Sequence, residues 1–114
     1  MKIYDAPALA RTAVGGQDRP ATTLVHDSRD ARVVIFRLDP GQAVSVHTSP
    51  STVLLTIVSG IGTVTGAEGE RSVKAGDVVA YAEHEPHGMT AAGGQLVIVA
   101  VIAPRPGPRS PEGR

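Results

Sequence analysis

The feature that most constrains this chain is a succession of short runs rich in Val, Ile and Thr, separated by Gly, Pro and Asp. Val, Ile and Thr favour the pleated, half-buried surface of a sheet, whereas Gly and Pro mark turns. The 114 residues provide room for one domain, and helix-forming residues rarely occur in succession. The sequence therefore predicts an all-β fold, a sandwich or barrel of roughly nine or ten short strands.

We expect a single helical turn within residues 6–13, ended by Gly15 and Gly16. Two of the expected strands, 53–58 and 95–103, are apolar on both faces, so both faces should be covered. One face can line a barrel interior, while the other must meet a second sheet or a second chain, so we expect a homodimer. The expected strands cover residues 22–26, 32–38, 43–48, 53–58, 63–65, 71–74, 78–82, 87–90 and 95–103, with a short edge strand at 1–4.

Composition excludes several classes of function. Eleven Lys and Arg balance eleven Asp and Glu, and aromatic residues are scarce, so no nucleic-acid partner is expected. The chain has no Cys, its first residues lack the apolar stretch of a signal peptide, and no apolar run approaches the ~20 residues of a membrane helix. We therefore expect a cytoplasmic protein without membrane contact. Residues 1–103 should form the barrel, and residues 104–114, rich in Pro, Gly and Arg, should form a disordered tail.

Two segments contain the residues that could bind a ligand or a metal. The first, residues 41–60, contains a turn, a strand ending in His47, and a second, apolar strand. The second segment ends in His87, forty residues after His47. Strand alternation places His47 on the same face as Ser45 and on the opposite face from Val44. If the two segments lie side by side in a sheet, the two imidazoles converge inside the barrel.

The first segment resembles the first motif of the cupin superfamily. Gly41, His47 and Gly60 stand at the family spacing. Ser49 stands where the family has its second His, and Val53 stands where the family has a Glu. Two of the residues that this motif supplies for metal binding are therefore replaced.

The second segment resembles the second cupin motif, with Gly76-Asp77 and His87 in place. The family's Pro, Gly and Asn are replaced by Ala82, His84 and Ala91. The resemblance extends over residues 32–103. It implies a small single-domain cupin with a degenerate metal motif, folded as a double-stranded β-helix, the jelly-roll barrel.

In cupins, the two His and the Glu of the first motif and the His of the second hold a divalent metal, usually Mn, Fe, Ni, Zn or Cu. Here only His47 and His87 remain at ligand positions, and two imidazoles alone would hold such an ion loosely. A third ligand could come from His84, Glu85 or Glu83 in the loop before His87. The alternative for each of these three is a polar side chain on a solvated loop.

The replacement of Glu by Val53 also makes one wall of the barrel interior apolar, beside Leu55. An apolar cavity with a few placed polar groups is typical of a small-molecule site. In addition to the two histidines, we expect the pocket to be lined by Ser49, Val53, Leu55, Tyr81 and Met89.

Three functions remain open at this point. The first is a binding module that holds a small molecule, with or without a weakly held metal, through His47 and His87. The second is a metal-dependent enzyme, such as a dioxygenase, isomerase or decarboxylase, with a third ligand not evident from the sequence. The third is a non-catalytic structural dimer. Ser49 and Val53 disfavour the enzyme, and the two histidines disfavour the structural dimer. The fold does not choose among the three, and no catalytic residue or organic cofactor is indicated.

Overall fold

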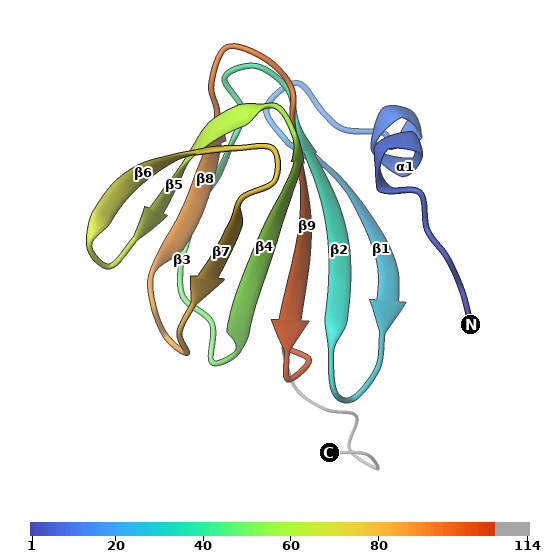
Figure 1. The fold of residues 1–114 in the computed structure, drawn as a ribbon, viewed down its shortest axis with the longest axis vertical. Coiled ribbons are helices and arrows are strands. Elements are labelled where there is room, and N and C mark those ends of the chain that lie inside the picture. The colour runs from blue at the N-terminus through green and yellow to red at the C-terminus, as the bar shows by residue number, and fades with distance from the viewer. Residues whose placement is uncertain (107–114) are drawn as a thin grey trace.

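The computed structural model describes residues 1–106 and contains two antiparallel sheets that face each other (Figure 1). The larger sheet has the strand order β1-β2-β9-β4-β7, and the smaller has the order β3-β8-β5-β6. One helix, α1 (Ala6–Thr12), precedes the strands. The strands are β1 (Ala21–Asp27), β2 (Arg32–Leu38), β3 (Ala43–His47), β4 (Thr52–Ser59), β5 (Ile61–Gly66), β6 (Gly69–Lys74), β7 (Val78–Tyr81), β8 (His87–Ala91) and β9 (Leu96–Ala103).

This arrangement confirms the predicted all-β jelly-roll fold, and a strand occupies each range expected between residues 22 and 103. The prediction of an edge strand at residues 1–4 is wrong. This segment pairs with no strand and is exposed, because it stands away from β1 and leads directly into α1 (Figure 1). Within residues 1–106, no helix has the length and apolar character needed to cross a membrane.

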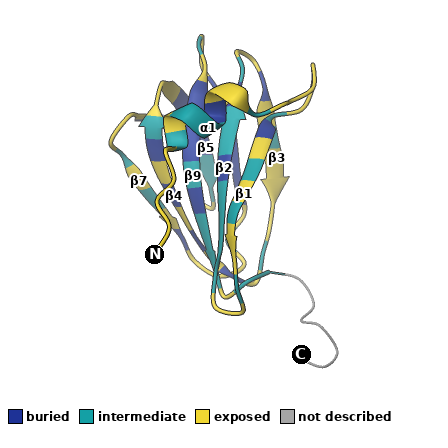
Figure 2. Cartoon of the chain, turned by 90° about the vertical axis from the view of Figure 1, so that its right-hand side faces the viewer, coloured by how far each residue is buried: buried dark blue, intermediate teal, exposed yellow. Residues whose placement is uncertain are grey.

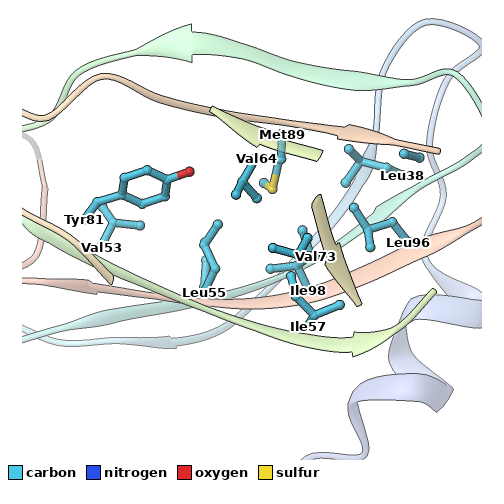
Figure 3. Close-up of a cluster of buried hydrophobic side chains, with 12 residues drawn as sticks. Leu38, Val53, Leu55, Ile57, Val64, Val73, Tyr81, Met89, Leu96 and Ile98 are labelled. Atoms are coloured by element: carbon cyan, nitrogen blue, oxygen red, sulfur yellow. The ribbon is translucent and has the colours of Figure 1, made fainter. Parts of the chain in front are cut away.

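The core lies between the two sheets and follows from strand alternation. In β4, Val53, Leu55 and Ile57 are buried, while the residues between them are exposed. The deepest side chains of the core, Leu38 and Ile98, are fully buried, and each contributes roughly 1.5–3 kcal/mol of hydrophobic stabilisation. Figure 3 shows how these side chains from both sheets meet in one apolar cluster.

Helix α1 packs on the outer face of the larger sheet (Figure 2). The Asp5 side chain caps its first turn by accepting a hydrogen bond from the backbone N–H of Ala8, at 3.0 Å. At the other end, the Arg37 guanidinium of β2 donates to the carbonyls of Ala10 and Ala13, at 2.7 and 2.9 Å. Arg37 thereby supplies a cation and two donors where the carbonyls at the end of the helix lack partners.

The helix covers only part of this outer face. Val97 of β9 is buried beneath it, together with Ile35 of β2. Leu54 of β4, in contrast, is 38% exposed. We expected both faces of both apolar strands to be covered. This is so for β9 where α1 packs on it, but within a single chain the outer face of β4 is not covered.

The C-terminal residues of the described structure contact the barrel. The sequence predicted a disordered tail from Pro104 to Arg114. Within that range, the carbonyl of Pro104 accepts a hydrogen bond from Ser51, and Arg105 pairs with Asp27. Residues 107–114 lie outside the described residues.

Candidate functional site

Strand pairing brings the two histidines together. His47 ends β3 and His87 begins β8, and the two are direct partners in the antiparallel ladder. Their ring centroids lie 4.2 Å apart, with the rings at 62° to each other. The prediction that the two sequence segments lie side by side is confirmed, although forty residues separate the histidines in the chain.

A register shift in β3 gives His47 its direction. Val44 pairs with Met89, and His47 pairs with His87. Two residues lie between the paired positions on β3, but only one lies between them on β8. As a result, Val44 and His47 both face the interior. The prediction that they lie on opposite faces is wrong, because a β-bulge adds a residue and breaks the alternation.

Both imidazoles are held in one tautomer by the backbone. The Nδ1 atom of His47 lies 2.8 Å from the carbonyl oxygen of Ser45, and that of His87 lies 2.9 Å from the carbonyl oxygen of Glu85. A carbonyl oxygen only accepts, so Nδ1 carries the hydrogen in both rings. In the neutral form, Nε2 of each ring is then an unprotonated acceptor. The site therefore presents two adjacent acceptors, one on the exposed His47 and one on His87, which is 8% exposed.

These rings border a cavity of about 310 Å³ at one end of the barrel. The cavity wall is mostly aliphatic and aromatic, and it includes no Lys, Arg, Asp or Glu among the described residues. Every pocket residue expected from the sequence is in this wall. The full set is Phe36, Val44, His47, Thr48, Ser49, Pro50, Val53, Leu55, Tyr81, His87, Gly88, Met89, Ala100, Ile102 and Pro106.

The sequence reasoning missed the wall contributed by β2 and β9. Phe36 pairs with Ile98, so it shares the inward face of the larger sheet. Ala100 pairs with Leu55, and Ile102 pairs with Val53, so all four residues face the same interior. Alternation within each strand signals this face, but only the register between strands shows which residues stand beside the histidines.

Tyr81 lines the cavity, but its hydroxyl is already engaged and is not available as a proton donor. Its hydroxyl donates to the carbonyl of Thr65 at 2.8 Å, and its ring lies 5.1 Å from that of His87. Burial, with a smaller contribution from the charge of Glu85, raises the pKa of the Tyr81 hydroxyl. Tyr81 is therefore protonated near neutral pH and already has a hydrogen-bond acceptor.

Glu85, proposed from the sequence as a third metal ligand, is engaged elsewhere. Its carboxylate accepts hydrogen bonds from the backbone N–H of Ala82, at 3.0 Å, and of Ala67, at 3.1 Å. Both bonds lower the pKa of the Glu85 carboxyl, and the bond from Ala82 has the larger effect. The side chain thus fastens the β5–β6 hairpin to the loop before β8.

His84, the other candidate ligand in this loop, is exposed and has a left-handed backbone, with φ at 64°. Its backbone N–H donates to the carbonyl of Ser49 at 2.7 Å. Glu83 is also exposed. Within residues 1–106, no group of three or more His, Cys, Asp and Glu side chains is placed to hold a metal ion.

Comparison with known proteins decides the family. A model of the cupin domain matches residues 34–102, well over half of the chain. The chain belongs to the cupin family. No curated protein matches it.

Several solved structures share this cupin fold. The TT1209 protein of Thermus thermophilus is 28% identical, with a TM-score of 0.82 over 93% of this chain and 100% of that one. An uncharacterized conserved protein with a double-stranded β-helix domain from Klebsiella pneumoniae is 24% identical, with a TM-score of 0.82 over 92% and 91%. A predicted oxalate decarboxylase from Thermotoga maritima is also 24% identical, with a TM-score of 0.71 over 74% and 79%.

Cupins often bind a divalent metal, but the donor set of this cupin does not fit such a centre. Ser49 offers a neutral hydroxyl, and its oxygen already accepts a hydrogen bond from the backbone N–H of Ser51 at 3.1 Å. Val53, at the position of the family's Glu, is aliphatic and 4% exposed. With Glu85 bound to backbone amides, no carboxylate among the described residues joins the two imidazoles.

Proposed function

We propose that this cupin binds one small, largely apolar molecule in its barrel and places hydrogen-bond donors of that molecule against His47 and His87. The observation that supports this proposal is the pair of imidazoles whose Nδ1 atoms are occupied by backbone carbonyls. Both residues line a cavity that is otherwise mostly apolar, and in the neutral form each ring keeps an unprotonated Nε2 that can accept a hydrogen bond. Polar groups that are few and fixed in an apolar cavity orient a ligand and determine its specificity.

The described residues that line the cavity include no Lys, Arg, Asp or Glu, and this limits the class of ligand that could bind. No Lys or Arg lines the cavity among the described residues, so a carboxylate or phosphate would be buried without a fixed cationic partner. The volume of about 310 Å³ equals that of about ten water molecules at the ~30 Å³ each occupies in the liquid. We therefore favour a neutral molecule with an apolar body and a donor-bearing head, such as a phenol.

This chemistry differs from that of oxalate, the substrate class named for the Thermotoga maritima neighbour. Oxalate is a small dianion, which would require cations or a metal centre to balance its charge. In this chain, Val53 and Leu55 form an aliphatic wall near the histidines, and two imidazoles would hold a divalent metal only loosely. The proposal is accordingly a binding function without a resident metal centre.

The direct test is calorimetric titration with three probes of similar size: 4-ethylphenol, ethylbenzene and 4-ethylbenzoate. We expect 4-ethylphenol to bind about tenfold more tightly than ethylbenzene, since a hydrogen bond to a buried acceptor contributes roughly 1–1.5 kcal/mol. Because the phenol has one donor and the site has two acceptors, the double variant His47→Phe with His87→Phe should remove this preference, whereas His84→Gln, outside the cavity, should retain it. Equal binding of phenol and ethylbenzene, or tighter binding of the benzoate, would refute the assignment.

Elemental analysis of the freshly purified protein tests the enzyme alternative. A stoichiometric metal that is lost in both His47→Ala and His87→Ala would overturn the metal-free site and favour a metal-dependent enzyme. The proposal instead expects less than stoichiometric metal in the wild type, even after growth in metal-supplemented medium.

We also propose that two copies of this cupin associate through the outer face of the larger sheet. Leu54 and Val78 on this face are 38% and 66% exposed, and Ile3 in the N-terminal segment is 86% exposed. Figure 2 shows that segment on the same side of the molecule as α1, so the exposed apolar groups lie on one side. Exposed apolar groups that occur together often mark an interface. Light scattering should give a dimer that Leu54→Lys weakens, and a mass of 11.7 kDa for the wild type would refute this proposal.

A further inference from the structure

The chain continues past β9 and reaches the mouth of the cavity. Residues Pro104, Arg105 and Pro106, here called the strap, follow directly on the strand whose Ala100 and Ile102 line the cavity. Pro106 itself is part of the cavity wall. The strap therefore closes part of the same space that the histidines border.

Two side chains hold the strap, and they differ in burial. The Ser51 hydroxyl donates to the carbonyl of Pro104 at 2.7 Å, and Ser51 is 1% exposed. One residue further on, the Arg105 guanidinium donates twice to the Asp27 carboxylate, at 2.6 and 3.1 Å. The side chains of Arg105 and Asp27 are 32% and 28% exposed.

This difference gives the strap a fixed end and a releasable end. The bond from Ser51 is shielded from water, so breaking it would leave buried polar atoms without partners. The pair between Arg105 and Asp27 is accessible to water, which can replace its hydrogen bonds at little cost. Opening at the Arg105 end would move Pro106 away from the cavity while Pro104 stays in place.

We propose that the strap is a gate over the cavity mouth and that the ion pair between Arg105 and Asp27 holds it closed. The role of this gate in ligand exchange rests on the proposed binding function, because it controls entry to the same cavity. Partly exposed ion pairs shift an equilibrium by a factor of about two to five, so the gate opens readily. Loss of the pair should raise the open population by a similar factor.

Reaction of His87 with diethyl pyrocarbonate measures this opening without any ligand. The reagent acylates an unprotonated imidazole nitrogen and releases ethanol and carbon dioxide, and mass spectrometry of peptides locates the adduct. His87 is 8% exposed, so its reaction rate should follow the open population. The exposed His84 in the same sample provides an internal reference for reagent concentration.

The variants are Asp27→Ala and Arg105→Gln, with Arg32→Gln as the matched control. Arg32 also contacts the Asp27 carboxylate, at 3.5 Å, but belongs to β2 and not to the strap. We expect the rate at His87, relative to His84, to rise about two- to fivefold in the first two variants and to stay within twofold of wild type in the control. An increase below twofold in Asp27→Ala and Arg105→Gln, or an equal increase in Arg32→Gln, would overturn the gate.

This outcome is separate from that of the binding test. If no phenol binds but the rate at His87 rises as expected, the ligand assignment fails and the gate stands. If phenol binds and the rate at His87 does not change, the gate fails and the binding function stands.

Discussion

Replacement of His84 by Gly should stabilise this cupin. His84 has φ at 64°, a conformation in which a β-carbon costs about 1–2 kcal/mol. Glycine avoids that cost but loses about 0.5–1 kcal/mol through the greater freedom of the unfolded chain. The backbone bond from residue 84 to the carbonyl of Ser49 is kept in the variant. We therefore expect a net gain of about 0.5–1 kcal/mol, or roughly 2–5 °C in Tm for a domain of this size.

His84→Ala is the control, because it removes the imidazole but keeps the β-carbon. Urea unfolding followed by circular dichroism should place His84→Ala within about 0.5 kcal/mol of wild type. His84→Gly should have the higher midpoint at an unchanged slope, which excludes a change in the surface exposed on unfolding. If His84→Gly is no more stable than His84→Ala, the left-handed backbone is not strained and the reasoning fails.

Three further predictions follow from the site and the strap. The double variant Ser49→His with Val53→Glu should acquire zinc-dependent stability, about 2.7 kcal/mol at a free zinc concentration of 100 times Kd, whereas the midpoint of wild type should not respond in the same titration. Glu85→Ala should speed amide hydrogen exchange in the β5–β6 hairpin by removing its anchor to the loop before β8, and Glu83→Ala should leave that exchange unchanged. Hydrogen bonding from the strap's arginine lowers the pKa of Asp27, so this pair stabilises the fold above about pH 4 and loses that effect as pH falls through the lowered pKa. The difference in Tm between wild type and Asp27→Ala should therefore be constant near neutral pH and should shrink as the pH is lowered below about 4. A difference that does not shrink over that range would contradict this assignment.

Local sequence signals located the strands, because short β-branched runs have Gly and Pro between them, and they predicted a sandwich or barrel. The jelly-roll topology was predicted from the resemblance of the segments around His47 and His87 to the two cupin motifs. The strand and turn signals depend on residues close in sequence, so they can be recognised without knowing which strands are neighbours. The same signals wrongly predicted a strand at residues 1–4, which have no adjacent strand to pair with.

The geometry of the site was harder to predict from the sequence, because it depends on the register between strands and on hydrogen bonds from side chains to the backbone. The bulge that turns Val44 inward leaves no mark in a strictly alternating stretch. Glu85 was a plausible ligand by charge and position, but two backbone amides compete for its carboxylate, and one of them belongs to a distant hairpin. The anchoring of Arg105 by Asp27 joins residues 78 positions apart in the sequence, so composition alone indicated only a tail.

The position of Pro106 at the cavity mouth offers a way to observe occupancy by fluorescence. The chain contains no Cys, so Pro106→Cys would create a single site for a thiol-reactive dye. A dye at this position would sense the polarity of the mouth, and any molecule that enters the barrel would change its emission. A library of metabolites could then be screened on the folded protein before its ligand is identified, and each signal could be checked against unlabelled protein by calorimetry.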